Sequence, residues 1–197
     1  MDASHVADDL ESVILTEEQI LTRVGELASE LHEHFGSRTP VLVGVLGGAA
    51  TFTVDLARAY PGQLEIGWMA AKSYSTGNRA SGSVRLLKDL DIDITGRDVV
   101  IVDGVIDTGL TMSWLITNLA QREPASITVC ALLRKPETAH VEAGTPTYVG
   151  FDVGEGLIVG YGLDHEGHYR NLRCAAVLAP AVYAARRGRR VAPHGRT

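Results

Sequence analysis

The sequence has few of the features that mark secreted, membrane or metal-cluster proteins. Only two cysteines, Cys130 and Cys174, occur among 197 residues, each in an apolar stretch, so we expect buried free thiols rather than a disulfide or metal site. No apolar run is long enough to cross a membrane, and the polar, acidic residues 1–9 do not resemble a secretory signal. These absences favour a cytoplasmic protein without membrane attachment.

Positive charge is scarce except at the C-terminal end. The formal net charge is −6, but residues 186–197 carry five arginines and no acidic side chain. The remaining residues therefore carry 13 basic against 24 acidic side chains, which argues against nucleic acid as a partner. The Arg-rich end has Gly, Pro and no apolar periodicity, so 186–197 is predicted to be a disordered tail; a tether to nucleic acid or membrane is the alternative.

The spacing of apolar residues predicts an α/β protein. The hydrophobic content of 45% suits one globular domain over residues 1–185. A capping-box pattern at Thr16 and Gln19 opens an N-terminal helix within residues 12–36. Strand-like runs at 41–46, 64–73, 86–94, 99–102 and 127–133 alternate with helical segments, which predicts a mostly parallel sheet in a core of residues 40–135. Residues 136–183 then form a smaller C-terminal part.

Residues 99–111 (VVIVDGVIDTGLT) combine a strand, two acids and a glycine-containing turn before a helix. The four β-branched residues at 99–102 are typical of a strand buried on both faces. A strand, loop and helix in this order point backbone N–H groups at an anion, and Thr108 and Thr111 add hydroxyl donors. The P-loop pattern is absent. Acidic residues beside an anion cradle indicate a phosphorylated sugar, bound together with Mg²⁺.

This stretch resembles the phosphoribosyl-pyrophosphate (PRPP) motif of type I phosphoribosyltransferases. Four more segments follow the order and spacing of the hypoxanthine-guanine phosphoribosyltransferases: 43–56 (VGVLGGAATFTVDL), 73–82 (SYSTGNRASG), 132–137 (LLRKPE) and 149–172 (VGFDVGEGLIVGYGLDHEGHYRNL). The resemblance implies transfer of a phosphoribosyl group from PRPP to hypoxanthine or guanine, giving IMP or GMP and pyrophosphate. It also implies the type I fold with a small hood, a Mg²⁺ cofactor, and a homodimer or homotetramer.

The resemblance assigns most PRPP contacts to this stretch and two nearby loops. The expected PRPP and phosphate contacts are Asp103, Gly104, Thr108, Gly109, Leu110, Thr111, Gly47, Gly48 and Arg170. A non-proline cis peptide is expected in the loop of Gly47. The flexible loop that closes over the site is expected at 74–84, with Ser73 and Tyr74 at its base. Asp103 and Asp164 are the expected acidic groups near Mg²⁺.

The base side of the site is assigned in the same way. Asp107 is the expected catalytic acid, handling the proton near purine N7. Lys135 would donate to the 6-oxo group of the base, and Ile158 would read a purine edge through its backbone carbonyl. Leu157 stands where the family commonly stacks an aromatic ring. Asp164, in the same C-terminal segment, is expected among the base contacts as well as near Mg²⁺.

Three residues depart from the family's pattern. Gly47 replaces a lysine, Gly104 replaces the second carboxylate of an acidic pair, and Leu157 replaces the aromatic residue. We expect Gly104 to weaken the grip on the ribose hydroxyls, and Gly104→Asp to strengthen it where the backbone admits a side chain. Two alternatives therefore stay open: a phosphoribosyltransferase with altered base preference, and a weakly catalytic PRPP-binding partner subunit.

Overall fold

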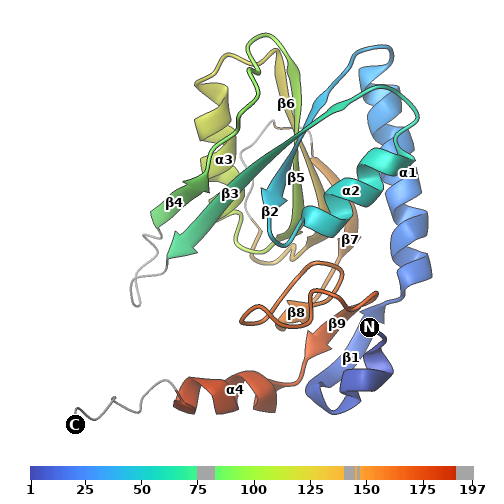
Figure 1. Ribbon diagram of the computed structural model, residues 1–197, viewed down its shortest axis with the longest axis vertical. Coiled ribbons are helices and arrows are strands. Elements are labelled where there is room, and N and C mark those ends of the chain that lie inside the picture. The colour runs from blue at the N-terminus through green and yellow to red at the C-terminus, as the bar shows by residue number, and fades with distance from the viewer. Residues whose placement is uncertain (75–82, 140–144, 146, 190–197) are drawn as a thin grey trace.

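The structure, a computed structural model, describes residues 1–74, 83–139, 145 and 147–189. A six-stranded sheet in the order β4-β3-β2-β5-β6-β7 forms its centre, and a three-stranded sheet in the order β1-β9-β8 lies beside it (Figure 1). The large sheet consists of β2 (Val41–Leu46), β3 (Glu65–Tyr74), β4 (Ser83–Lys88), β5 (Asp98–Ile106), β6 (Ser126–Arg134) and β7 (Thr147–Asp152). The small sheet, which we call the hood, consists of β1 (Leu10–Leu15), β8 (Ile158–Val159) and β9 (Ala175–Leu178).

The large sheet is parallel except at one edge. β2 pairs with β3 and β5, β5 with β6, and β6 with β7, all in parallel, whereas β4 runs antiparallel to β3. The carboxyl ends of β2, β5 and β6 therefore meet at one edge, as expected of an α/β sheet that binds a ligand there. The predicted fold class is confirmed.

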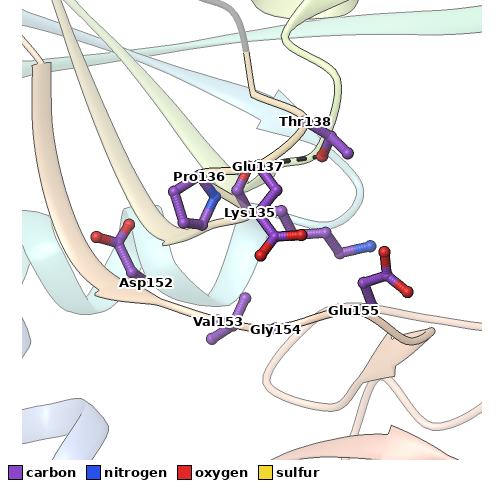
Figure 2. Close-up of a pocket in the computed structure, with 8 residues that line it drawn as sticks. All are labelled: Lys135, Pro136, Glu137, Thr138, Asp152, Val153, Gly154 and Glu155. Carbon is purple, nitrogen blue, oxygen red and sulfur yellow. Dashed lines mark hydrogen bonds between the residues drawn. The ribbon is translucent and has the colours of Figure 1, made fainter.

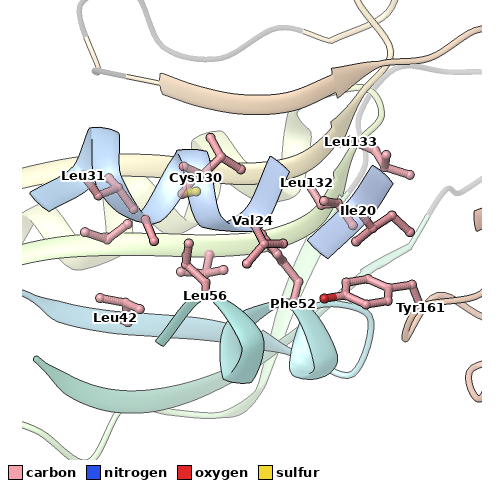
Figure 3. Packing of buried hydrophobic residues seen from close by; sticks show 14 of the residues in the cluster. Ile20, Val24, Leu31, Leu42, Phe52, Leu56, Cys130, Leu132, Leu133 and Tyr161 are labelled. Carbon is pink, nitrogen blue, oxygen red and sulfur yellow. The ribbon is translucent and has the colours of Figure 1, made fainter. Parts of the chain in front are cut away.

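Helices cover both faces of the large sheet. α1 (Glu17–Phe35) and α2 (Ala50–Ala59) pack on one face with α3 (Leu110–Ala120) on the other. Figure 3 shows the first layer, where Ile20 and Val24 of α1 meet Phe52 and Leu56 of α2 above the sheet. β5 is buried on both faces, which explains why residues 99–102 form an unbroken apolar run.

The N-terminal helix begins at the predicted capping box. The Thr16 hydroxyl accepts a hydrogen bond from the Gln19 backbone N–H at 3.2 Å, and the Gln19 side chain accepts one from the Thr16 N–H at 2.8 Å. The helix ends at Gly36, whose φ of 58° favours glycine. The residues just before the helix form β1, so only part of the predicted 12–36 segment is helical.

The predicted strand at 86–94 is wrong beyond Lys88, where β4 ends. The side chains of the aspartates that follow accept hydrogen bonds from nearby backbone N–H groups, which are then not available for pairing with a neighbouring strand. Asp89 accepts from the Leu90 N–H at 2.8 Å, and Asp93 accepts from the Thr95 N–H at 3.0 Å. Such local bonds compete with strand pairing, so the segment turns although its isoleucines and leucines alternate with polar residues.

The C-terminal end contains one more helix than the sequence predicted. α4 (Pro180–Arg189) follows β9 and extends four residues into the predicted tail, while residues 190–197 lie outside the described ranges. Both cysteines are free and buried, as expected. Among the helices in the described part of the chain, none has the length and apolar character needed to span a membrane.

Candidate active site

A pocket of about 510 Å³ opens at the carboxyl edge of the large sheet. Its walls come from the end of β2, from β5, from the 107–109 turn and from the start of α3. Three carboxylates, Asp103, Asp107 and Asp164, line it together with Thr108 and Thr111. The pocket thus brings together predicted residues from Gly48 to Asp164, which are 116 positions apart in the sequence.

The turn before α3 has the geometry of an anion cradle. Gly109 is the N-cap of α3 and has φ of 79°, a left-handed conformation that favours glycine. No side chain caps this helix, although the Thr108 hydroxyl accepts a 3.4 Å hydrogen bond from the Leu110 N–H. The amides of the first helical turn have no partner within a helix, and they add a partial positive charge to the pocket.

Asp103 is half-buried at the base of this pocket. Its Oδ1 atom accepts the Gly104 N–H at 2.7 Å. Burial raises the pKa of Asp103 to about 7, although hydrogen bonds from the Gly104 and Val105 N–H groups act in the opposite direction. The charged carboxylate is therefore costly without a ligand, and a cation or hydroxyl donors in the pocket would stabilise it.

Gly104 is packed against the first loop. A Cβ atom there would lie 2.9 Å from the Gly48 carbonyl oxygen and 3.0 Å from Leu163 Cδ2. The backbone of Gly48 therefore occupies the space that a side chain at position 104 needs. We expected Gly104→Asp to strengthen substrate binding where the backbone admits a side chain. The backbone at position 104 does not admit one, so this expectation is wrong.

We predict instead that Gly104→Asp destabilises the protein. Overpacking against backbone costs about 1–3 kcal/mol, or roughly 2–10 °C in Tm for a chain of this size. Calorimetry of the parent, Gly104→Asp and Gly25→Asp measures this. Gly25 is a matched control because a Cβ there meets nothing within 4 Å. A Gly104→Asp protein that melts with the parent and binds PRPP more tightly would contradict the steric explanation.

The loop of Gly47 lies beside Arg170. The Leu46–Gly47 peptide is cis, as the resemblance implies. A Cβ on Gly47 would lie 3.4 Å from Cζ of Arg170, so the guanidinium stands next to the glycine that replaces the family's lysine. Arg170 also pairs with Asp164 at 2.8 Å and donates to the Gly162 carbonyl at 2.7 Å. A cation is therefore present at this side of the site.

A second pocket, of about 270 Å³, lies beyond the end of β6. It is lined by Lys135 to Thr138 and by Asp152 to Glu155 (Figure 2). Lys135 Nζ lies 3.3 Å from Asp107 Oδ2, so one ion pair connects this pocket with the larger one. Asp152 is paired with Arg134, with N–O distances of 2.7 and 2.9 Å.

Thr138 is a contact of Asp107 that the sequence did not reveal. The chain turns after β6, with the Ala139 N–H donating to the Lys135 carbonyl at 2.8 Å. This turn places the Thr138 hydroxyl 3.0 Å from the Asp107 carbonyl oxygen and 3.3 Å from its Oδ1. No sequence pattern marks a threonine at this position, because the contact depends on how the turn folds back over β5.

Some predicted residues lie elsewhere. Leu157 packs against the core of the hood, and Ile158 is buried in β8; neither lines either of the two pockets. β3 runs through Ser73 to Tyr74 at the predicted base of the flexible loop. The predicted loop itself falls largely on residues 75–82, outside the described part of the chain.

The comparisons with known proteins agree with this architecture. The phosphoribosyl transferase domain family matches residues 12–164. The chain is 47% identical over 183 residues to the hypoxanthine-guanine phosphoribosyltransferase of Mycobacterium avium, with 89% of each chain covered. It is 40% identical over 175 residues to that of Bacillus subtilis, with 89% of this chain and 97% of the relative covered.

Solved structures give the same result. The crystal structure of a hypoxanthine phosphoribosyltransferase from Staphylococcus aureus has a TM-score of 0.84 to this chain at 36% sequence identity. The match covers 91% of this chain and 97% of that one. The family match and these identities show that the chain belongs to the hypoxanthine-guanine phosphoribosyltransferase family.

Proposed function

We propose that the protein transfers the 5-phosphoribosyl group from PRPP to hypoxanthine or guanine, producing IMP or GMP and pyrophosphate. The observation that supports this most directly is the Lys135–Asp107 ion pair between two adjoining pockets. A transferase that joins two substrates needs neighbouring sites with the reacting groups between them. One pocket carries the anion cradle, and the other carries a lysine suited to an oxo group.

The larger pocket suits PRPP. The α3 amides and the hydroxyls of Thr108 and Thr111 would bind the 5′-phosphate, and Asp103 would accept hydrogen bonds from the ribose hydroxyls. Arg170, beside Gly47, would contact the pyrophosphate. The proposed site also includes three glycines, Gly47, Gly48 and Gly104. They would act through their backbone groups and through close packing of the chain, because they have no side chain to carry charge.

Asp107 and Lys135 suit the base. Lys135 would donate to the 6-oxo group of the purine, and Asp107 would take the proton that leaves N7 as the ring nitrogen bonds to the ribose carbon. The electron pair of the broken carbon–oxygen bond leaves with pyrophosphate. Leu157 and Ile158 remain proposed base contacts, which would require the hood to approach the second pocket.

The donor set fits Mg²⁺ bound mainly through the substrate. Within the described ranges, no group of three or more His, Cys, Asp or Glu side chains is arranged to hold a metal alone. Asp103 and Asp164 nevertheless line the PRPP pocket, and Mg²⁺ commonly takes one or two carboxylates together with phosphate oxygens and water. When bound, the ion would neutralise charge on the leaving pyrophosphate.

The decisive experiment measures PRPP-dependent nucleotide formation with Mg²⁺ over hypoxanthine, guanine, xanthine and adenine. We expect turnover of hypoxanthine or guanine and little of adenine. Turnover confined to another base would favour the altered-preference alternative. PRPP binding without turnover of any base would favour the partner subunit and refute the proposed enzyme.

We predict that Lys135→Ala loses hypoxanthine and guanine turnover while it keeps PRPP affinity. Removing a hydrogen bond to a group that stays buried costs about 1–3 kcal/mol, or roughly 10–100-fold in kcat/KM for the base. Lys88→Ala is the matched control, since the Lys88 ammonium donates to the Trp68 and Asp89 carbonyls at 3.1 Å and to Asp91 at 3.5 Å, and Lys88 lines neither pocket. Unchanged kcat/KM for both bases would show that Lys135 does not bind the base.

We also propose that the protein works as a homodimer or homotetramer in the cytoplasm. Family membership supports the assembly, and two free, buried thiols are compatible with a reducing compartment. Sedimentation velocity at several protein concentrations tests the assembly. A monomer that retains full turnover would contradict it.

A further inference from the structure

Thr138 lies between the two pockets, and the proposed function gives it no role. Its side chain lines the smaller pocket (Figure 2), while its hydroxyl reaches Asp107, which lines the larger one. The hydroxyl has three oxygen neighbours: the Asp107 carbonyl at 3.0 Å, Asp107 Oδ1 at 3.3 Å and the Lys135 carbonyl at 3.5 Å. It therefore contacts the carboxylate and backbone of Asp107 and the backbone carbonyl of Lys135.

The two oxygens of the Asp107 carboxylate are held by different groups. Oδ2 lies 3.3 Å from Lys135 Nζ, and Oδ1 lies 3.3 Å from the Thr138 hydroxyl. Two contacts on opposite oxygens fix the plane of a carboxylate, whereas one contact leaves it free to rotate about its terminal torsion. The Asp107 side chain is exposed, so these contacts, rather than packing, set its orientation.

A hydroxyl suits a group that changes its protonation state. Toward a carboxylate, the threonine O–H donates; toward a carboxylic acid, its oxygen lone pairs accept. Thr138 can therefore remain a partner of Asp107 before and after Asp107 receives the purine proton. Lys135, an ammonium with donors only, favours the charged form alone.

We propose that Thr138 is a positioning residue for Asp107, holding its carboxylate toward the base through the whole proton transfer. This inference rests on the proposed function, since it concerns how Asp107 works in that reaction. It assigns a role in the chemical step to a side chain on the turn after β6, and it predicts that this role depends on the hydroxyl rather than on the size of the side chain.

Thr138→Val tests the proposal, because valine keeps the shape and removes the hydroxyl. We expect the single-turnover rate with guanine to fall by about 10–100-fold, the size expected for a lost hydrogen bond to a charged group. The KM for PRPP should stay within about twofold. Thr138→Ser should restore the rate, and Thr138→Ala, also without a hydroxyl, should behave like Thr138→Val if the valine variant folds poorly.

The pH profile separates positioning from a merely structural effect. Because the hydroxyl can partner both forms of Asp107, its loss should lower the single-turnover rate across the whole pH profile rather than at one end of it. The other charged side chains lining the two pockets are unchanged in the variant: Lys135, Asp103, Asp164, Glu137, Asp152 and Glu155. Thr117→Val is the control, since the Thr117 hydroxyl on α3 donates to the Ser113 carbonyl at 2.9 Å and does not line either pocket.

The outcomes distinguish this inference from the proposed function. A parent protein that transfers no phosphoribosyl group to any base would refute the function and the inference with it. A parent that is active while Thr138→Val and Thr138→Ala match its rate and pH profile would refute the inference alone. A loss in Thr138→Val that serine fails to restore would assign Thr138 to shape rather than to hydrogen bonding and would also overturn it.

Discussion

Replacing Asp107 with asparagine is expected to slow phosphoribosyl transfer by about 10²–10⁴-fold, the usual contribution of general acid–base catalysis. Asparagine keeps the shape of the side chain. Its amide oxygen can accept from Lys135 and its NH2 group can donate to the Thr138 hydroxyl oxygen, the two groups that lie 3.3 Å from the carboxylate oxygens in the parent. It cannot take up a proton from the purine. PRPP affinity should change only a few-fold, because the anion cradle lies on the α3 side of the turn.

The measurement is a single-turnover rate with enzyme in excess over PRPP, which separates chemistry from product release. Asp91→Asn provides a matched control, since its side chain is 75% exposed and pairs with Lys88 away from both pockets. If Asp107→Asn reacts within a few-fold of the parent, Asp107 has a structural role at the turn. The transfer would then need another proton acceptor.

Much of the fold follows from local sequence patterns. The central strand is recognisable because four β-branched residues, 99–102, occur together and are completely buried on both faces. The first long helix is recognisable because its capping box specifies both hydrogen bonds at Thr16 and Gln19. The strand predicted at 86–94 fails because Asp89 and Asp93 bond to the backbone there, and the spacing of apolar residues does not reveal that competition.

The candidate site is predictable where it depends on strand ends. Parallel strands bring their carboxyl ends to one edge, which is why Asp103, Asp107 and Lys135 lie together as their positions after β-runs suggest. Contacts between loops are harder to predict from the sequence. The obstruction at Gly104 comes from the Gly48 carbonyl, and the approach of Thr138 to Asp107 comes from a turn; neither produces a periodic signal in the sequence.

Asp103 illustrates a conflict between stability and ligand binding. Burial raises the pKa of its carboxyl to about 7 in the folded protein, against an ordinary value of 3.8. The folded state therefore binds more protons than the unfolded state between about pH 4 and pH 7, and stability must fall as the pH rises through that range. Above about pH 7 both states are ionised, so the loss reaches a constant value.

Asp103→Asn should remove this loss. The amide keeps an oxygen for the Gly104 N–H, which donates to Oδ1 at 2.7 Å in the parent, and it carries no charge at any pH. A pKa difference of this size corresponds to stability on the order of 4 kcal/mol. We expect the unliganded variant to melt roughly 8–16 °C above the parent at pH 8 and close to it at pH 4.

The same substitution should weaken PRPP binding in the presence of Mg²⁺. A hydrogen bond to a charged group contributes about 1.5–3 kcal/mol, or roughly 10–100-fold in affinity. Differential scanning calorimetry across pH 4–8 and titration calorimetry with PRPP measure the two effects, with Asp91→Asn again as the exposed control. A Tm difference independent of pH would contradict the claim that ionisation of Asp103 destabilises the folded protein. Unchanged PRPP affinity would show that Asp103 does not bind the ribose or the metal. Both effects together would mean that the chain keeps a destabilising carboxylate because the substrate, its hydroxyls and its metal supply the partners that the folded protein alone does not.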